Sequence, residues 1–404
     1  MIIKNLPTEF EQARPIMQAI ESAGFEAYFV GGSVRDTILN KPIHDVDIAT
    51  SAYPEEIKKI FKRTVDTGIE HGTVMILDHG EGYETTTFRT ESGYQDFRRP
   101  DEVTFVRSLS EDLQRRDFTI NALAMKETGE IIDLFDGLRD LDNQLIRTVG
   151  EAYERFHEDA LRMMRAVRFA SQLNFKIDSA TLTGIEENSA LLEKIAVERI
   201  RVELEKMFMG QTVQAGLDAF IDTDLYRYCP GMDIYRTELQ SLTESELPSL
   251  DSDTEVWTFI TYLFGLQNGS STHFLKTWKT SNQIITDVLK IQKVIEAILA
   301  EQLTPKVVYD AGLERALSAQ KIAIFFGGTI KNDEIKNIYQ NLPIKNKSDL
   351  NIDGGQLIKV AHIKPGPLLG KVLFAIENQV VNGDLANKQE ELVSFATQMV
   401  TEEG

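Results

Sequence analysis

The hydrophobic pattern of this chain changes near residue 150, and that change limits the folds the chain can adopt. Before Gly150, a helical segment that ends at Gly24 precedes the apolar strand AYFV, and VDIAT and the hairpin TVMILDHGEGYETTTF add further strands. After Gly150, long amphipathic segments such as AYERFHEDALRMMRAVRFASQL and SALLEKIAVERIRVELEKMF replace the strand patterns. The sequence therefore predicts an α+β protein, in which a mixed α/β head is followed by an all-helical remainder.

Composition excludes several classes of protein. The net charge of −20 argues against a protein that coats nucleic acid by bulk attraction, so any RNA contact must use local basic patches. The single cysteine, Cys229, excludes an intrachain disulfide and a cysteine-based zinc site. The chain has no apolar run near the ~18 residues of a membrane span, and its start, MIIKNLPTEF, lacks a signal-peptide pattern. We therefore expect a cytoplasmic protein without membrane contact.

A glycine turn follows the first strand. Gly31-Gly32-Ser33 leads into the helical segment SVRDTILN, which carries Arg35. Glycines let backbone amides approach a ligand closely, and the start of a helix favours anions, so this turn suits a triphosphate. A plain tight turn explains an isolated Gly-Gly more often than a ligand site does, and the absence of a G-K-[ST] ending excludes the common P-loop.

Two carboxylates follow on the next strand. In Asp45-Val46-Asp47-Ile48, the alternation of a strand places both acids on one face and the apolar residues on the other. Two carboxylates this close repel each other unless a divalent cation lies between them, and such oxygen ligands suit Mg2+ together with substrate phosphates. Two ordinary surface acids are the alternative for an isolated D-x-D.

A charged segment, SEDLQRRDFTINALAM, predicts a helix that Ser110 caps. It would present Arg115, Arg116, Asp117 and Asn121, and Arg116 can then reach triphosphate oxygens. A solvated charged face is the alternative on spacing alone.

The most informative spacing lies in EDALRMMRAVR. Asp159, Arg162, Arg165 and Arg168 recur every three residues, which predicts one polar stripe on a helix. An aspartate accepts hydrogen bonds and an arginine donates them, so Asp159 with Arg162 would match the amino group and ring nitrogen that cytosine and adenine share. Arg165 and Arg168 would hold phosphates or the primer end. An ordinary salt-bridged helix remains the alternative.

Five segments occur in order between about residues 25 and 206: GGSVRD, HDVDIAT, RRDFTINALA, EDALRMMRAVRFA and KIAVERIRVELEKM. Together they resemble the motif set of the class II CCA-adding enzymes, the tRNA nucleotidyltransferases of the polymerase beta superfamily in bacteria and eukaryotes. The resemblance implies a template-independent, two-metal enzyme that adds and repairs the 3'-terminal CCA of tRNA. It would use CTP, ATP and Mg2+ and release diphosphate.

The resemblance also implies roles for individual residues. Asp45 and Asp47 would be catalytic and bind the metal, and Glu84 is a candidate third carboxylate or a structural residue. The ATP- and CTP-binding residues would be Gly32, Arg35, Arg116, Asp159, Arg162, Arg165 and Arg168. The segment Thr90 to Pro100, TESGYQDFRRP, takes the place of the family's flexible loop, which favours complete CCA addition over CC addition alone.

Four domains follow from the same resemblance: a catalytic head (1–148), a helical neck with the nucleotide-selecting face (149–210), a helical body (211–310) and a tRNA-binding tail (311–404). The expected partner is tRNA, through its 3' end and its elbow. The Pro365-Gly366 turn with Lys364 and Lys371 would contact the elbow, and an interhelical turn is the alternative there. The resemblance also suggests a homodimer.

Other functions remain open at this point. A poly(A) polymerase shares the head, and the Asp159 and Arg162 pair would not separate A from C, so poly(A) polymerase and partial CC- or A-adding enzymes are alternatives. A catalytically inactive RNA-binding module would be expected to have lost a carboxylate or the glycine turn, and both are present.

Overall fold

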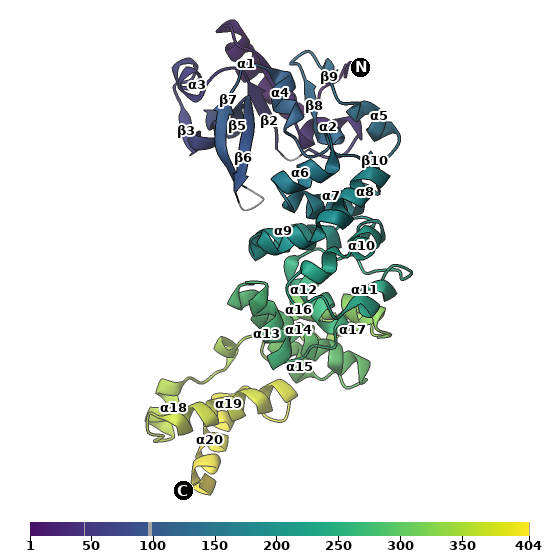
Figure 1. Ribbon diagram of the computed structural model, residues 1–404. Helices are drawn as coiled ribbons and strands as arrows, with labels where there is room; N and C mark the ends of the chain where they lie inside the picture. The colour runs from purple at the N-terminus through teal and green to yellow at the C-terminus, as the bar shows by residue number, and fades with distance from the viewer. Residues whose placement is uncertain (44, 96–98, 404) are drawn as a thin grey trace. The chain divides into compact units, whose positions relative to one another are not determined.

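The computed structural model describes residues 1–43, 45–95 and 99–403 and divides into two compact units, Met1–Ser245 and Glu246–Gly404. The first unit contains α1 (Thr8–Ser22), β1 (Ala27–Val30), α2 (Gly32–Ile38), β2 (Asp47–Thr50), α3 (Pro54–Ile60), β3 (Thr64–Gly68), η1 (Ile69–His71), β4 (Thr73–Asp78), β5 (Glu81–Thr87), β6 (Arg89–Gln95), β7 (Arg99–Phe105), α4 (Leu109–Gln114), η2 (Thr119–Asn121), β8 (Leu123–Met125), β9 (Ile131–Asp133), α5 (Gly137–Asp142), β10 (Leu145–Ile146), α6 (Ala152–Glu158), α7 (Leu161–Leu173), β11 (Lys176–Ile177), α8 (Ser179–Asn188), η3 (Ser189–Lys194), α9 (Val197–Phe208), α10 (Val213–Asp222), η4 (Leu225–Tyr228) and α11 (Arg236–Ser241) (Figure 1).

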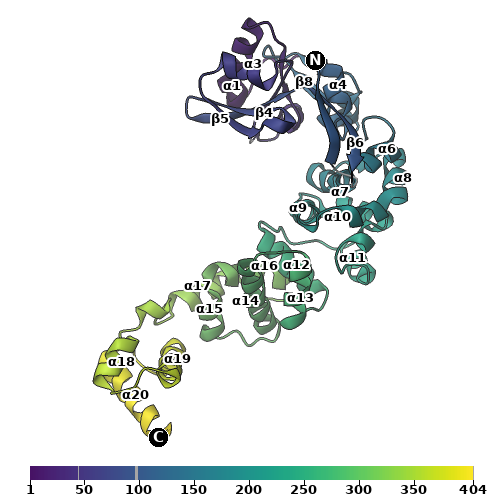
Figure 2. The same ribbon diagram turned by 60° about the vertical axis from the view of Figure 1, so that its left-hand side comes forward.

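All regular elements among the described residues of the second unit are helices (Figure 2). It contains α12 (Asp253–Leu263), α13 (Gly269–Thr277), α14 (Asn282–Leu299), α15 (Pro305–Ala311), α16 (Leu313–Phe325), α17 (Asn332–Gln340), η5 (Lys347–Asp349), α18 (Gly354–Val360), α19 (Pro367–Asn382) and α20 (Gln389–Glu403). The predicted α+β class, with a mixed head and a helical remainder, is confirmed. The short strand β11, which pairs with β10, is a small addition to the helical part. No helix among the described residues is both long and apolar enough to cross a bilayer.

A seven-stranded mixed sheet forms the head, in the order β3-β4-β5-β2-β1-β8-β9. Its centre positions the acidic residues: β2 runs antiparallel to β1, with Val30 opposite Asp47, and parallel to β5, with Ile48 opposite Thr85. Continuing that parallel register by one residue brings Asp47 beside Glu84. The two acids therefore lie on neighbouring central strands.

Both faces of the sheet are covered, which explains the apolar sequence of β1. On one face, Val30 belongs to a buried cluster with Phe88 and with Leu113 of α4. On the other face, the rings of Phe29 and Phe10, the latter from α1, have centroids 4.6 Å apart. The predicted hairpin is present as β4 and β5.

The charged segment after residue 108 is not one helix, and this prediction was wrong. The helix α4 ends at Gln114, and its N-cap is Ser108, whose Oγ accepts from the backbone N–H of Glu111, rather than Ser110. Beyond α4, the Asp117 carboxylate accepts from the backbone N–H of Phe118 at 2.8 Å, which competes with helical hydrogen bonding. The following residues are fully buried and form strand β8, so the sheet overrides their helical pattern.

The predicted long helix after residue 150 is also interrupted. It divides into α6 and α7 at Asp159, whose backbone is extended (φ −139°, ψ 100°). Its Oδ1 accepts a hydrogen bond from the backbone N–H of Leu161 at 3.0 Å. Asp159 therefore precedes α7, whereas Arg162, Arg165 and Arg168 lie on that helix.

The segment Thr90 to Pro100 falls on the antiparallel strands β6 and β7. Residues 96–98 of this segment lie outside the described residues, so its assignment as a flexible loop stays a prediction.

Candidate active site

A cleft of about 1010 Å³ in the first unit brings most of the predicted site residues together. Its lining includes Gly32, Arg35, Asp47, Arg116, Asp159, Arg162, Arg165 and Arg168. Asp45 lines a smaller neighbouring cleft of about 390 Å³, together with Asp47 and Glu84. Asp47 is thus the residue that faces both spaces.

The glycine turn lies directly against the charged part of the cleft. Gly31 has φ +75°, a left-handed conformation that favours glycine. A Cβ at this position would lie 3.5 Å from Nη1 of Arg116 and 3.7 Å from Oδ2 of Asp47. A side chain there would be strained by this φ, although its Cβ would make only ordinary contacts with both groups, so the backbone conformation is what favours glycine.

The acidic side chains are exposed, in contrast to the apolar residues between them. Val46 and Ile48 are buried, whereas Asp45, Asp47 and Glu84 are exposed, as the predicted strand alternation requires. Partial desolvation within the cleft raises the pKa of Asp47, the Glu84 and Asp45 carboxylates raise it further, and Arg116 lowers it. The acids therefore repel one another where no cation lies between them.

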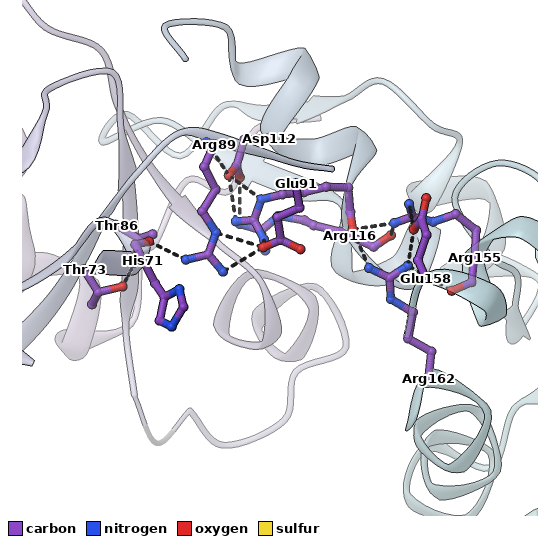
Figure 3. A network of polar contacts seen from close by, with 11 residues as sticks. His71, Thr73, Thr86, Arg89, Glu91, Asp112, Arg116, Arg155, Glu158 and Arg162 are labelled. Atoms are coloured by element: carbon purple, nitrogen blue, oxygen red, sulfur yellow. Dashed lines mark hydrogen bonds and ion pairs between the residues drawn. The ribbon is translucent and has the colours of Figure 1, made fainter. Parts of the chain in front are cut away.

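Arg116 is held by a buried carboxylate. Asp112 is almost fully buried and accepts from Nη2 of Arg115 at 2.7 Å and from Nη2 of Arg116 at 3.2 Å. Burial by itself would raise the pKa of Asp112, but the two guanidinium groups hold it below its usual value. Figure 3 shows this contact within a longer polar network.

The same network reaches the helical part of the unit (Figure 3). Nη2 of Arg155, on α6, donates to the carbonyl oxygens of Arg115 and Arg116, the latter at 2.8 Å. Arg162, on α7, donates from Nη2 to the carbonyl of Arg115 at 3.0 Å and from Nη1 to Oε2 of Glu158 at 2.8 Å. These bonds fix the end of α4 relative to α6 and α7.

A second set of contacts links Arg35 to α7. Oδ2 of Asp117 accepts from Nε of Arg165 at 2.7 Å, and Oδ1 accepts from Asn121 at 3.1 Å. Asn121 in turn accepts from Nη1 of Arg35 at 2.7 Å. Burial would raise the pKa of Asp117, but Arg165 and the hydrogen bonds from Asn121 and the Phe118 amide hold it far below its usual range.

Arg168 and Asp159 complete the lining of the cleft. Burial lowers the pKa of Arg168 to about 10, and the carboxylate of Glu203, 2.9 Å from Nε, offsets part of this shift. The guanidinium also lies over the ring of Phe169, 4.1 Å from its centroid. Desolvation raises the pKa of Asp159, and the nearby guanidinium groups of Arg162 and Arg199 partly offset that rise. The cleft as a whole is rich in arginine and suits a polyanion.

Comparison with known proteins identifies the family. Residues 27–147 match the poly A polymerase head domain, 174–235 a probable RNA and SrmB-binding site of polymerase A, and 249–396 a putative tRNA nucleotidyltransferase domain 2. The CCA-adding enzyme of Limosilactobacillus reuteri is 58% identical over the full length of both chains. The chain belongs to the CCA-adding enzyme family. The CCA-adding enzyme of Enterococcus faecalis is 52% identical and covers 98% of each chain.

A solved CCA-adding enzyme supports the same assignment. The crystal structure of the Bacillus stearothermophilus CCA-adding enzyme in complex with CTP has a TM-score of 0.89 and 39% identity, and the match covers 98% of this chain and 99% of that one. A Thermotoga maritima CCA-adding enzyme complexed with tRNA is 22% identical with a TM-score of 0.63, which shows a shared fold.

Sequence reasoning missed several residues of the cleft in this CCA-adding enzyme. Arg89, Glu91, Gln172 and Arg199 also line it. Arg199 belongs to the segment KIAVERIRVELEKM, to which the sequence analysis assigned no contact with substrate. A positive charge early in that helix was the available signal, because basic residues are usually placed at the other end of a helix.

Proposed function

We infer that the protein adds and repairs the 3'-terminal CCA of tRNA, using CTP and ATP and releasing diphosphate. The observation that carries this inference is the match to CCA-adding enzymes over the full chain, 58% identical in one relative. In the reaction, the 3'-hydroxyl oxygen of the RNA bonds to the α-phosphorus of the nucleotide. The bond from that phosphorus to the bridging oxygen breaks, diphosphate leaves, and the hydroxyl proton is lost.

We propose that Asp45 and Asp47 hold Mg2+, with Glu84 as a third carboxylate. Their exposed oxygens suit this hard cation, and the pKa of Asp47 is raised by desolvation and by the Glu84 and Asp45 carboxylates, both of which a bound cation would offset. Within the described part of the chain, no three His, Cys, Asp or Glu side chains already converge on one point. Phosphates of the substrate would therefore complete the ligand set. Bound Mg2+ would lower the pKa of the attacking hydroxyl and neutralise charge on the leaving diphosphate.

We propose that the triphosphate binds beside Gly32, Arg35 and Arg116. The open glycine turn next to Arg116 supports this placement, because the guanidinium already lies close to the turn and is held there by Asp112. Arg165 and Arg168 add positive charge to the same cleft.

We propose that Asp159 and Arg162 select the base. Of the five N–H groups of a guanidinium, Arg162 directs three to Glu158 and to the carbonyls of Arg155 and Arg115. The other two have no acceptor among the described residues and can donate to the ring nitrogen and carbonyl of cytosine, or to the ring nitrogen of adenine. Oδ2 of Asp159 can accept from the exocyclic amino group of either base. Uracil and guanine present the reverse pattern and would leave these groups unpaired.

A labelled-nucleotide assay tests the function. The purified protein is incubated with tRNA lacking CCA and with labelled CTP, ATP, UTP or GTP. We expect two C and then one A per tRNA, no U or G, and no incorporation by the Asp45→Ala, Asp47→Ala double variant, which should still bind tRNA. Long A tails without C would contradict CCA addition and favour a poly(A) polymerase. Addition of CC or of A alone would indicate a partial enzyme.

The remaining proposals concern the helical part and the assembly. We propose the domains 1–148, 149–210, 211–310 and 311–404, with the tail contacting the tRNA elbow. Lys364 and Lys371 are exposed beside the start of α19, where Gly366 has φ +154°, and this supports an anion contact there. A homodimer and a cytoplasmic location are proposed from the family alone, and light scattering of the purified protein tests the dimer.

A further inference from the structure

Among the described residues, eight arginines line the main cleft, and seven of them are paired. These seven are Arg35, Arg89, Arg115, Arg116, Arg162, Arg165 and Arg168, and each forms an ion pair with a carboxylate. The eighth, Arg199, lines the same cleft but has no ion pair or side-chain hydrogen bond among the described residues. Among the arginines of the cleft, Arg199 is therefore the one whose positive charge is least neutralised by described protein groups.

The position of Arg199 in its helix is also unfavourable for the protein alone. It is the third residue of α9, in the first turn, where the partial positive charge of the helix terminus repels a cation. Residues that violate a local rule without a compensating contact are expected at functional positions.

The surroundings of Arg199 indicate which substrate it meets. It lies close enough to Asp159 to offset part of the desolvation of that carboxylate, so it lies beside the proposed base-selecting residues. It comes from α9, which packs against α7, and Figure 1 shows both helices below the sheet. The proposed triphosphate position, beside Gly32, Arg35 and Arg116, instead follows the end of β1, an interior strand of the sheet.

We propose that Arg199 binds a phosphodiester group near the 3' end of the RNA. This inference rests on the proposed function. If the triphosphate lies at the glycine turn and the base lies at Asp159, the nucleotide has no further phosphate to offer Arg199. A phosphate there must belong to the second substrate, whose terminal hydroxyl has to reach the same cleft.

The test compares Arg199→Ala and Arg199→Lys with the control Lys206→Ala. Lys206 is an exposed cation at the other end of α9 and does not line the cleft. We expect Arg199→Ala to raise the KM for tRNA about tenfold, as loss of a charged hydrogen bond would, with the KM for CTP and ATP unchanged. The slope of log KM against log salt should fall by about 0.7, the value for one phosphate of a single strand. Arg199→Lys should recover part of the loss, and Lys206→Ala should behave as the wild type.

Chemically altered RNA makes the test specific. A neutral methylphosphonate is placed singly at the last or the penultimate linkage of the primer. At one of these linkages the methylphosphonate should lower kcat/KM of the wild type about tenfold. The same change in the RNA should not lower kcat/KM of Arg199→Ala further, because this variant already lacks the contact. Equal losses in both proteins at both linkages would overturn the proposal. A raised KM for the nucleotide with an unchanged KM for tRNA would also overturn it and assign Arg199 to the nucleotide.

Two controls separate the possible failures. If the wild type adds no CCA in the same assay, the proposed function fails; if the wild type is active and Arg199→Ala equals it, only this inference fails. Because Arg199 forms no ion pair or side-chain hydrogen bond among the described residues and lies in a first helical turn, Arg199→Ala should unfold close to the wild-type temperature. A large fall in that temperature would indicate a structural role and overturn the proposal.

Discussion

Replacing Asp117 with Asn tests how the cleft is held in place. Asp117 is buried and accepts from Arg165 through one oxygen and from Asn121 and the Phe118 amide through the other. In Asp117→Asn the amide oxygen can keep the bonds from Asn121 and Phe118. The new NH2 group then faces the Arg165 donors, so the variant loses the ion pair and places donor against donor.

The structure sets the size of the effect. Removing one partner of a buried ion pair costs about 3–5 kcal/mol. The Arg165 side chain is 33% exposed, so water can solvate part of its charge. We therefore expect about 2–3 kcal/mol after discounting for that solvation. For a unit of this size, each kcal/mol lowers the thermal midpoint by about 2–4 °C, so the midpoint of the unit that contains Asp117 should fall by about 4–12 °C.

The assay is thermal unfolding of the full chain, followed by circular dichroism at several pH values. The pKa of Asp117 is lowered in the folded state, so its contribution is complete above the unfolded pKa of about 3.9 and is lost as pH falls through the folded pKa. The difference between wild type and Asp117→Asn should be the same at pH 7 and pH 5.5 and shrink below about pH 4. As a control, Glu130→Gln removes an exposed pair with Lys126 and should leave the thermal midpoint close to that of the wild type. A midpoint for Asp117→Asn within 2 °C of the wild type, an estimated tolerance, would refute the reasoning.

Three further predictions follow from single positions. Gly216→Ala should destabilise the protein by about 1–3 kcal/mol in urea unfolding, because the new Cβ would lie 2.4 Å from the carbonyl oxygen of Val167. Gly370→Ala places its Cβ in open space and should stabilise α19 by up to about 1 kcal/mol. Equal effects of the two substitutions would contradict the packing argument. Cys229 is buried, and burial raises its pKa, so a thiol reagent should label it only after unfolding; rapid labelling of the native protein would show the burial to be wrong. Glu84→Gln should lower kcat by about 100-fold without weakening tRNA binding, and an unchanged kcat would return Glu84 to a structural role.

Local patterns predicted much of the head. The apolar run of β1, the hairpin β4–β5 and the alternation around Asp47 depend on neighbours in sequence, and all three are present. The parallel pairing of β2 with β5 brings Glu84 beside Asp47. Because β4 and other elements separate these two strands along the chain, no local sequence pattern predicts that they pair. Buried strand β8 was mistaken for helix because tertiary burial overrode its propensity.

The candidate site shows the same division. Periodicity brought out Arg162, Arg165 and Arg168, but spacing does not reveal that Asp159 breaks the helix and accepts from the Leu161 amide. Nor does spacing distinguish a guanidinium that is fixed by carbonyls and Glu158, as in Arg162, from one that forms no ion pair or side-chain hydrogen bond among the described residues, as in Arg199. Those differences arise from contacts between elements that are distant along the chain.

Isothermal titration calorimetry of CTP binding, with and without Mg2+, tests the central claim most directly. We predict that the wild type binds CTP more tightly with Mg2+ than without it, and that the Asp45→Ala, Asp47→Ala double variant loses this difference while it remains folded. An equal effect of Mg2+ on both proteins, or no CTP binding by the folded wild type, would contradict the account.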